Sequence, residues 1–150
     1  MAKINAIKGI IILNYKRAMG VDFGQVRMGI ALSDPFRMIS SPIMTYKTKS
    51  TEEDLKFFCN FIDENAVDTV VFGLPLNMDG TEGKTAQMVR EFAGCLSKLK
   101  DVKIVFEDER LTSVEAEEIL LEANVRREKR KELIDRISAQ LILKQYLERR

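Results

Sequence analysis

The chain has 150 residues, of which 31% are charged and 45% hydrophobic, with a net charge of +1; this composition fits one globular domain and excludes a disordered chain. No apolar run approaches the roughly 20 residues that cross a bilayer and no signal peptide is recognisable, so we expect a cytoplasmic protein without a membrane partner. Histidine is absent and the two cysteines form no CxxC motif, which excludes Cys/His zinc sites and His-based catalysis. Any chemistry must therefore come from carboxylates, basic side chains, hydroxyls or an oxygen-ligated metal such as Mg²⁺ or Mn²⁺.

The first third of the chain is predicted to form a meander of short strands. Residues 1–16 are interpreted as an N-terminal extension, in which 8–14 forms either an added edge strand or a poorly ordered arm. Strands are predicted over 17–23, 27–33 and 38–46, and the short turns between them indicate antiparallel hairpins.

The rest of the chain alternates between helical and strand periodicities. A helix is predicted to begin at Thr51, with Asp54 as a variant of the capping box. Further elements follow in the order strand, loop, helix, strand, helix and helix, over 67–73, 74–83, 84–99, 102–106, from Thr112 or Ser113 to 123, and over 128–147. Hairpins followed by strand–helix units predict an α/β domain over 17–150, with a mixed five-stranded sheet and helices on both faces.

Asp22 stands at the end of the first predicted domain strand and is followed by Gly24 and Gly29. A carboxylate at a strand end beside glycines can face a ligand that comes close to the backbone. The same D-x-G pattern occurs where sugar kinases and actin-like ATPases hold phosphates and Mg²⁺, and it also occurs in ordinary turns. Asp22 is therefore a candidate metal ligand, with a simple turn residue as the alternative.

Asp108 and Glu109 come directly after the last predicted strand. Because side chains alternate along a strand, we expect only one of them to point with Asp22. The alternative is that these acids stabilise the N-terminus of the following helix.

Asp135 lies in the final predicted helix, on a face of small and apolar residues. A metal would offset the cost of burying this carboxylate, and a salt bridge with Lys131 or Arg136 is the alternative. Acids from three distant segments that converge on one point are the arrangement that two-metal phosphoryl hydrolysis requires, with ions about 4 Å apart.

Charge is distributed unevenly over the last third of the chain. Residues 107–122 carry seven acids against Arg110 alone, whereas 126–136 is strongly basic. This juxtaposition fits a metal site beside a phosphate-binding surface, and two solvated helix faces are the alternative. The candidate phosphate contacts are Arg126, Arg127, Arg130 and Lys131.

Four motifs stand out: RAMGVDFGQVRMGIALSDP (17–35), VVFGLPLNMDGTEG (70–83), EDERLTSVEA (107–116) and RKELIDRISA (130–139). Together they resemble the YqgF/RuvX family, over about residues 18–150. Members of that family are described as Holliday-junction resolvases or pre-16S rRNA nucleases. The resemblance implies a ribonuclease H-like fold, a divalent metal and cleavage of structured nucleic acid.

The resemblance also implies roles for individual residues. The family's acids match Asp22, the pair Asp108–Glu109, and Asp135; the implied substrate contacts are Arg27, Asn77, Asp79 and Arg110. Gln25-Val26 replaces a Thr-Lys that members often carry. Gly73-Leu74-Pro75 stands where proteins like the resolvase RuvC carry a glutamate, so the second acid of the site is expected to come from another segment.

The predicted function is a metal-dependent endonuclease that processes the 5′ end of pre-16S rRNA, with ribosomal precursor particles as partners. The first alternative is a resolvase of four-way DNA junctions, which requires a homodimer rather than a monomer. A non-catalytic nucleic-acid binding module is a second alternative. An ATPase of the actin and sugar-kinase type is disfavoured, because those enzymes close two domains of this fold around the nucleotide.

Overall fold

The computed structural model describes residues 3–7, 10–14, 16–109 and 112–149, and its main sheet has five strands in the order β5-β4-β3-β6-β7. The first three strands in sequence pair antiparallel, and the last two add in parallel to β3. The strands are β3 (Arg17–Asp22), β4 (Arg27–Ser33), β5 (Ser40–Lys47), β6 (Val67–Leu74) and β7 (Lys103–Asp108). The predicted mixed α/β sheet is thus confirmed.

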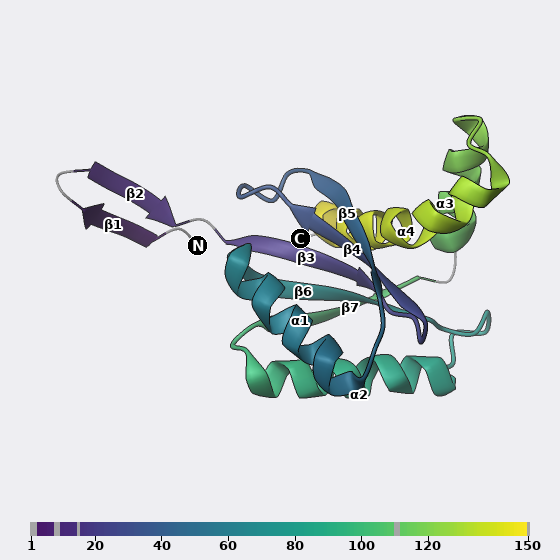
Figure 1. Cartoon of the computed structure of the whole chain (residues 1–150), viewed down its shortest axis with the longest axis horizontal. Coiled ribbons are helices and arrows are strands. Elements are labelled where there is room, and N and C mark those ends of the chain that lie inside the picture. Colours follow the sequence, from purple (N-terminus) through teal and green to yellow (C-terminus); the bar gives the residue numbers. More distant parts are fainter. Residues whose placement is uncertain (1–2, 8–9, 15, 110–111, 150) are drawn as a thin grey trace.

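Helices cover both faces of this sheet, as predicted (Figure 1). The bounds of the helices are α1 (Thr51–Glu64), α2 (Lys84–Leu99), α3 (Thr112–Glu122) and α4 (Arg127–Arg149). Strand alternation divides the core accordingly: Met19 and Val21 of β3 pack with residues of α1 and α2, whereas Ala18 packs with Ala139 and Leu143 of α4. Asp22, two residues beyond Gly20 and four beyond Ala18, therefore belongs to the face that α4 covers.

Small residues let α4 lie very close to the sheet. A Cβ atom placed on Gly20 would stand 2.6 Å from the carbonyl oxygen of Ala139 and 2.7 Å from Cβ of Leu143. Only a glycine fits at this distance, because both neighbouring atoms belong to or lie next to the helix backbone. The side of the sheet that carries Asp22 is thus covered by a helix at nearly its minimum separation.

The start of one strand and the cap of one helix differ from the sequence prediction for reasons visible in the hydrogen bonds. Strand β5 begins at Ser40 rather than at Met38, because the Asp34 carboxylate accepts hydrogen bonds from the backbone N–H groups of Met38 (2.8 Å) and Ile39 (2.7 Å) and holds them in a turn. Helix α1 is capped by Ser50, whose hydroxyl accepts from the Glu53 backbone N–H.

Asp54 was predicted to take part in a capping box, and that prediction is wrong. The residue is buried, and its carboxylate accepts hydrogen bonds from the Tyr46 hydroxyl (2.8 Å) and the Lys49 backbone N–H (2.9 Å). Burial, together with the Asp54 carboxylate, raises the pKa of Tyr46 to about 12. Asp54 therefore joins α1 to β5 instead of capping its own helix.

The N-terminal segment does not extend the main sheet. Strands β1 (Lys3–Ile7) and β2 (Ile10–Asn14) pair with each other, antiparallel, in a separate two-stranded sheet that stands apart from the domain (Figure 1). Of the two alternatives for 8–14, an added edge strand and a poorly ordered arm, the first is not observed for the described residues 10–14, which belong to this separate sheet. In the described part of the chain no helix is long and apolar enough to cross a membrane.

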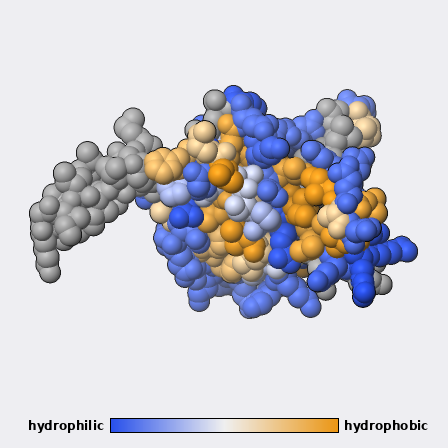
Figure 2. Space-filling view, turned by 90° about the horizontal axis from the view of Figure 1, so that it is seen from above, coloured by the Kyte–Doolittle hydropathy of each residue, from blue (hydrophilic) through white to orange (hydrophobic). Residues whose placement is uncertain are grey.

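The molecular surface is mixed in character. Seen from above, apolar side chains reach the surface in patches separated by charged ones (Figure 2). Exposed apolar side chains include Phe36, Met38 and Ile39 in the β4–β5 turn and Val114 and Leu121 in α3.

Candidate active site

Two glycines flank Asp22 on the neighbouring strands. Asp22 pairs with Gly29 on β4, and on the other side the pairing of Val21 with Phe72 places Gly73 of β6 beside it. A Cβ atom on Gly29 would overlap the backbone carbonyl of Asp135. Gly29 therefore lets the α4 backbone approach Asp22 from one side.

Gly73 leaves a corresponding space on the other side. A Cβ atom there would overlap the carboxylate of Glu109 and the Cδ1 atom of Ile142. The Glu109 side chain thus crosses β6 above Gly73 and reaches Asp22, with which it shares a side-chain hydrogen bond. The Glu109 backbone N–H donates to the carbonyl of Leu74 (3.3 Å), which continues the alignment of β7 with β6 by one residue.

Alternation along β7 separates Glu109 from Asp108. Glu107 is buried on the α4 side, where its carboxylate accepts hydrogen bonds from Gln145 (2.9 Å) and from Nε of Arg149 (2.7 Å). Glu109, two residues later, lies on the same side, and Asp108 between them is directed to the other. Of the pair Asp108–Glu109, the structure brings Glu109 to Asp22, while Asp108 contributes negative charge from a greater distance.

Asp22 and Glu109 lie so close together that ionisation of both carboxyl groups is strongly disfavoured. Burial, together with the Asp135 carboxylate, raises the pKa of Asp22 to about 7, although the hydrogen bond with Glu109 and the Arg27 guanidinium oppose the rise. Burial, with the charge of Asp22, raises the pKa of Glu109 to about 9. The Asp22–Glu109 pair therefore keeps a proton near neutral pH unless a cation replaces it.

Asp135 lies beside this pair but is engaged by Arg27. The Nε–H of Arg27, at the start of β4, donates to the Asp135 carboxylate. The salt-bridge alternative for Asp135 is thus observed, but with Arg27, a partner that the sequence analysis did not name; the side chain of Lys131, one of the two predicted partners, lies outside the described residues. With Asp135 held in this way, no group of three acids among the described residues is close enough together to hold a metal ion as it stands.

The donor set nevertheless fits a hard divalent cation. Asp22, Glu109 and Asp135 supply carboxylate oxygens only, which Mg²⁺ and Mn²⁺ prefer. Asp135 is close enough to Asp22 to raise its pKa. The spaces above Gly29 and Gly73, which a single Cβ atom would fill, bring these groups together at the sheet.

Several predicted substrate contacts are occupied by partners within the protein. Asn77 donates through Nδ2 to the Thr81 hydroxyl (2.9 Å), and Asp79 accepts from the Thr81 backbone N–H (2.9 Å), so both organise the 74–83 loop. Arg130 forms an ion pair with Glu117 (3.0 Å) and donates to the carbonyl of Val125 (2.9 Å).

Of the remaining predicted substrate contacts, two are exposed and the side chains of two lie outside the described residues. Arg126 and Arg127 are exposed at the start of α4. Arg110 and the side chain of Lys131 lie outside the described residues. The basic surface is therefore represented by two exposed arginines, about 12 Å along the helix axis from Asp135 for the nearer one.

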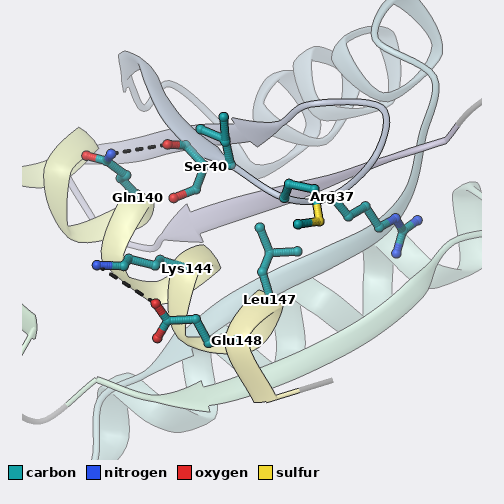
Figure 3. Close-up of a pocket in the computed structure, with 8 residues that line it drawn as sticks. Arg37, Ser40, Gln140, Lys144, Leu147 and Glu148 are labelled. Carbon is teal, nitrogen blue, oxygen red and sulfur yellow. Dashed lines mark hydrogen bonds and ion pairs between the residues drawn. The ribbon is translucent and has the colours of Figure 1, made fainter.

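A cavity of about 680 Å³ lies between the β4–β5 turn and the C-terminal half of α4, away from the acids. Its walls include Arg37, Ser40, Gln140 and Lys144 (Figure 3). Gln140 donates to the Ser40 carbonyl (3.1 Å) across this groove. Lys144 lies nine residues beyond Asp135, which is about 13 Å along α4. This groove lacks the convergent acids, and we place the candidate active site at Asp22.

Sequence reasoning missed two features of the site. From the sequence, Glu107 is treated only as part of an acidic run, yet Glu107 is buried and binds side chains at the end of α4. Its position two residues before Glu109, which puts both on the same face of the strand, could have indicated this. Arg27 was assigned to substrate, and no local pattern links it to Asp135, which is 108 residues away in sequence.

The family model and the relatives that match this chain are named after nucleases or resolvases. The family model described as RuvX, Holliday junction resolvase, matches residues 16–149. A protein of Halothermothrix orenii, provisionally named pre-16S rRNA nuclease, is 42% identical over 131 residues, which cover 87% of this chain and 94% of the relative. A protein of Endomicrobium trichonymphae with the same provisional name is 43% identical over 133 residues, covering 88% and 95%.

Solved structures share the fold at low sequence identity. RuvC of T. thermophilus, in complex with a Holliday junction substrate, has a TM-score of 0.58 at 10% identity and covers 90% of this chain and 98% of that one. The fowlpox virus resolvase in complex with Holliday junction DNA has a TM-score of 0.57 at 12% identity, with coverage of 88% and 97%. These similarities confirm the predicted ribonuclease H-like fold.

Proposed function

We propose that this chain, which belongs to the RuvX Holliday junction resolvase family, is a divalent-metal-dependent nuclease that hydrolyses phosphodiester bonds in structured nucleic acid. The nuclease domain is assigned to residues 17–150. The observation that carries the proposal is the meeting of Asp22 and Glu109 above Gly73, with Asp135 beside them. Carboxylates from three distant segments converge there in a chain that has no histidine.

Asp22, Glu109 and Asp135 are the proposed ligands of Mg²⁺ or Mn²⁺. When bound, the cation supplies charge stabilisation for the phosphate and a nucleophile from water, and a second cation fits the same chemistry. Asp22 acts as a ligand shared at the centre, because it stands between the other two acids. Asp108, on the other side of β7, is proposed to tune the charge of the site rather than to bind the metal directly.

The nucleic-acid backbone is proposed to lie along the start of α4. Arg126 and Arg127 are exposed there, and their contacts to phosphates would position the substrate without reading its sequence. Arg110 and the Lys131 side chain, which lie outside the described residues, remain proposed contacts. Because Asn77 and Arg130 are hydrogen bonded within the protein, we assign them to shaping the surface around the site.

The proposed substrate is the 5′ end of pre-16S rRNA, with ribosomal precursor particles as partners. Support comes from the relatives at 42% and 43% identity, whose names describe that activity. The family description favours a second candidate, resolution of four-way DNA junctions. That reaction requires two symmetric active sites and hence a homodimer.

The test incubates wild type and the Asp22→Asn variant with a precursor 16S rRNA fragment and with a four-way DNA junction, each in Mn²⁺ and in EDTA. Asp101→Asn is the matched control, because Asp101 is an exposed acid at the opposite end of β7 from Glu109. We expect wild type and Asp101→Asn to cleave the RNA only with Mn²⁺, and Asp22→Asn to remain folded and inactive. Full activity of Asp22→Asn would refute the site, and cleavage of the junction alone would replace the rRNA substrate by DNA.

A further inference from the structure

We propose that Arg27 is a built-in, displaceable counter-ion of the active site: it holds Asp135 in the metal-free protein and must release it before a divalent cation can bind. This inference rests on the proposed function, because it concerns the same three acids. It adds a determinant of metal affinity that lies outside the ligand set.

The Arg27–Asp135 contact lies at the mouth of the site. The Arg27 side chain is 47% exposed, whereas the Asp135 side chain is 19% exposed. The guanidinium therefore approaches the carboxylate from the solvent side. Because nearly half of the Arg27 side chain is exposed, the guanidinium can leave toward solvent.

The charges explain why an arginine is held there. Asp22, Glu109 and Asp135 bring several potential negative charges together, and Arg27 acts on two of them: it binds Asp135 directly and opposes the rise in the pKa of Asp22. A cluster of carboxylates without any cation is costly to form. Arg27 supplies one positive charge in the metal-free state, and a divalent cation supplies two.

Arg27 and the metal compete for the same carboxylate. Among the described residues no three acids are grouped closely enough to hold a metal ion, and the ion pair with Arg27 is what engages the third acid. Arg27 is held on one oxygen of the Asp135 carboxylate. A guanidinium and a metal cation on the same carboxylate repel each other, so each lowers the affinity of the other. Metal binding should therefore free the Arg27 guanidinium, and removal of Arg27 should favour the metal.

The backbone on either side of Arg27 is held in place, so the exchange requires only a side-chain movement. Thr48 donates through its hydroxyl to the carbonyls of Gln25 (2.6 Å) and Val26 (2.9 Å), and its backbone N–H donates to the Val26 carbonyl (3.0 Å). Gly29, two residues after Arg27, is pressed against the α4 backbone. The Arg27 side chain can therefore move while the backbone at the start of β4 stays in place.

The experiment measures Mn²⁺ binding by calorimetry, without nucleic acid, for wild type, Arg27→Gln, Arg27→Lys and Arg90→Gln. Arg90 is the matched control, because it lies on α2, which packs on the opposite face of the sheet from α4. Its side chain is 46% exposed and forms an ion pair with Glu82. We expect Arg27→Gln to bind Mn²⁺ more tightly than wild type by about 5- to 150-fold, the usual range for coupling between two ligands. Arg27→Lys, which keeps the charge, and Arg90→Gln should stay near the wild-type value.

A second measurement follows the arginine itself. In NMR spectra of the wild type, titration with diamagnetic Mg²⁺ should move the Nε–Hε resonance of Arg27 to the position that it has in metal-free Asp135→Asn, while that of Arg90 stays in place. An Arg27 resonance that does not respond to saturating Mg²⁺ would overturn the inference.

The possible outcomes separate this inference from the proposed function. Equal or weaker Mn²⁺ binding by Arg27→Gln overturns the counter-ion role alone and leaves the metal site standing. Absence of Mn²⁺ binding in every protein overturns both. Binding in the expected order by proteins that cleave no nucleic acid supports the counter-ion role and refutes the nuclease.

Discussion

Replacement of Gly20 by alanine tests how tightly α4 is pressed against the sheet. The new Cβ atom would lie 2.6 Å from the Ala139 carbonyl oxygen and 2.7 Å from Cβ of Leu143, whereas ordinary contact begins at 3.4 Å. Because neither obstacle is the end of a flexible side chain, α4 must retreat by about 0.8 Å or β3 must bend. Overpacking of this kind costs roughly 1–3 kcal/mol, which lowers the melting temperature of a chain of this size by about 2–12 °C.

The retreat also affects the site, because α4 carries Asp135. We therefore expect Gly20→Ala to lose Mn²⁺ affinity together with stability, as measured by thermal unfolding in EDTA and by calorimetry with Mn²⁺. Gly94→Ala is the control: Gly94 is exposed within α2 and an added Cβ atom meets nothing within 4 Å. That variant should be as stable as wild type or more stable by up to about 1 kcal/mol. A Gly20→Ala protein with unchanged melting temperature and Mn²⁺ affinity would refute the close packing.

Three further predictions concern charge. The pKa values of Asp22 and Glu109 are raised to about 7 and about 9, so above about pH 4 the native metal-free protein binds more protons than the unfolded chain. Its free energy of unfolding, measured by urea titration, should therefore fall as pH rises toward 9, and it should fall less steeply in Glu109→Gln. A wild-type free energy of unfolding that does not change with pH would contradict these pKa shifts. Mn²⁺ should raise the melting temperature of wild type but not that of Asp22→Asn, and equal shifts in both would argue against Asp22 as a ligand. Arg149→Ala leaves the Glu107 carboxylate, which is 4% exposed, without its cation and should lower the melting temperature. Lys144→Ala removes an exposed ion pair and should lower the melting temperature less; equal losses would show that Glu107 does not anchor α4.

Much of the fold could be predicted because local patterns repeat over whole elements. The period-2 and period-3.6 distributions of apolar residues indicated the order of strands and helices, and short turns indicated the antiparallel meander. The sequence prediction was wrong where side chains bind the backbone: Asp34 delays the start of β5, and Ser50 rather than Asp54 provides the cap of α1. Those choices depend on which of several nearby polar groups reaches which N–H.

The candidate acids were also readable from the sequence, as residue types at strand ends and on a helix face. The exchange of the second acid was partly visible too, because Gly73 stands where RuvC-like proteins carry a glutamate. What the motif could not show is that this glycine opens the path by which Glu109 crosses β6 to Asp22.

The sequence by itself therefore determined the α/β order of elements and the candidate acids Asp22, Asp108, Glu109 and Asp135, because strand and helix periodicity and residue chemistry are local properties. Only the tertiary structure decided that Glu109 rather than Asp108 meets Asp22, that Arg27 engages Asp135, and that β2 pairs outside the main sheet. These outcomes depend on strand register and on the separation of α4 from the sheet, which residues far apart in the chain set together.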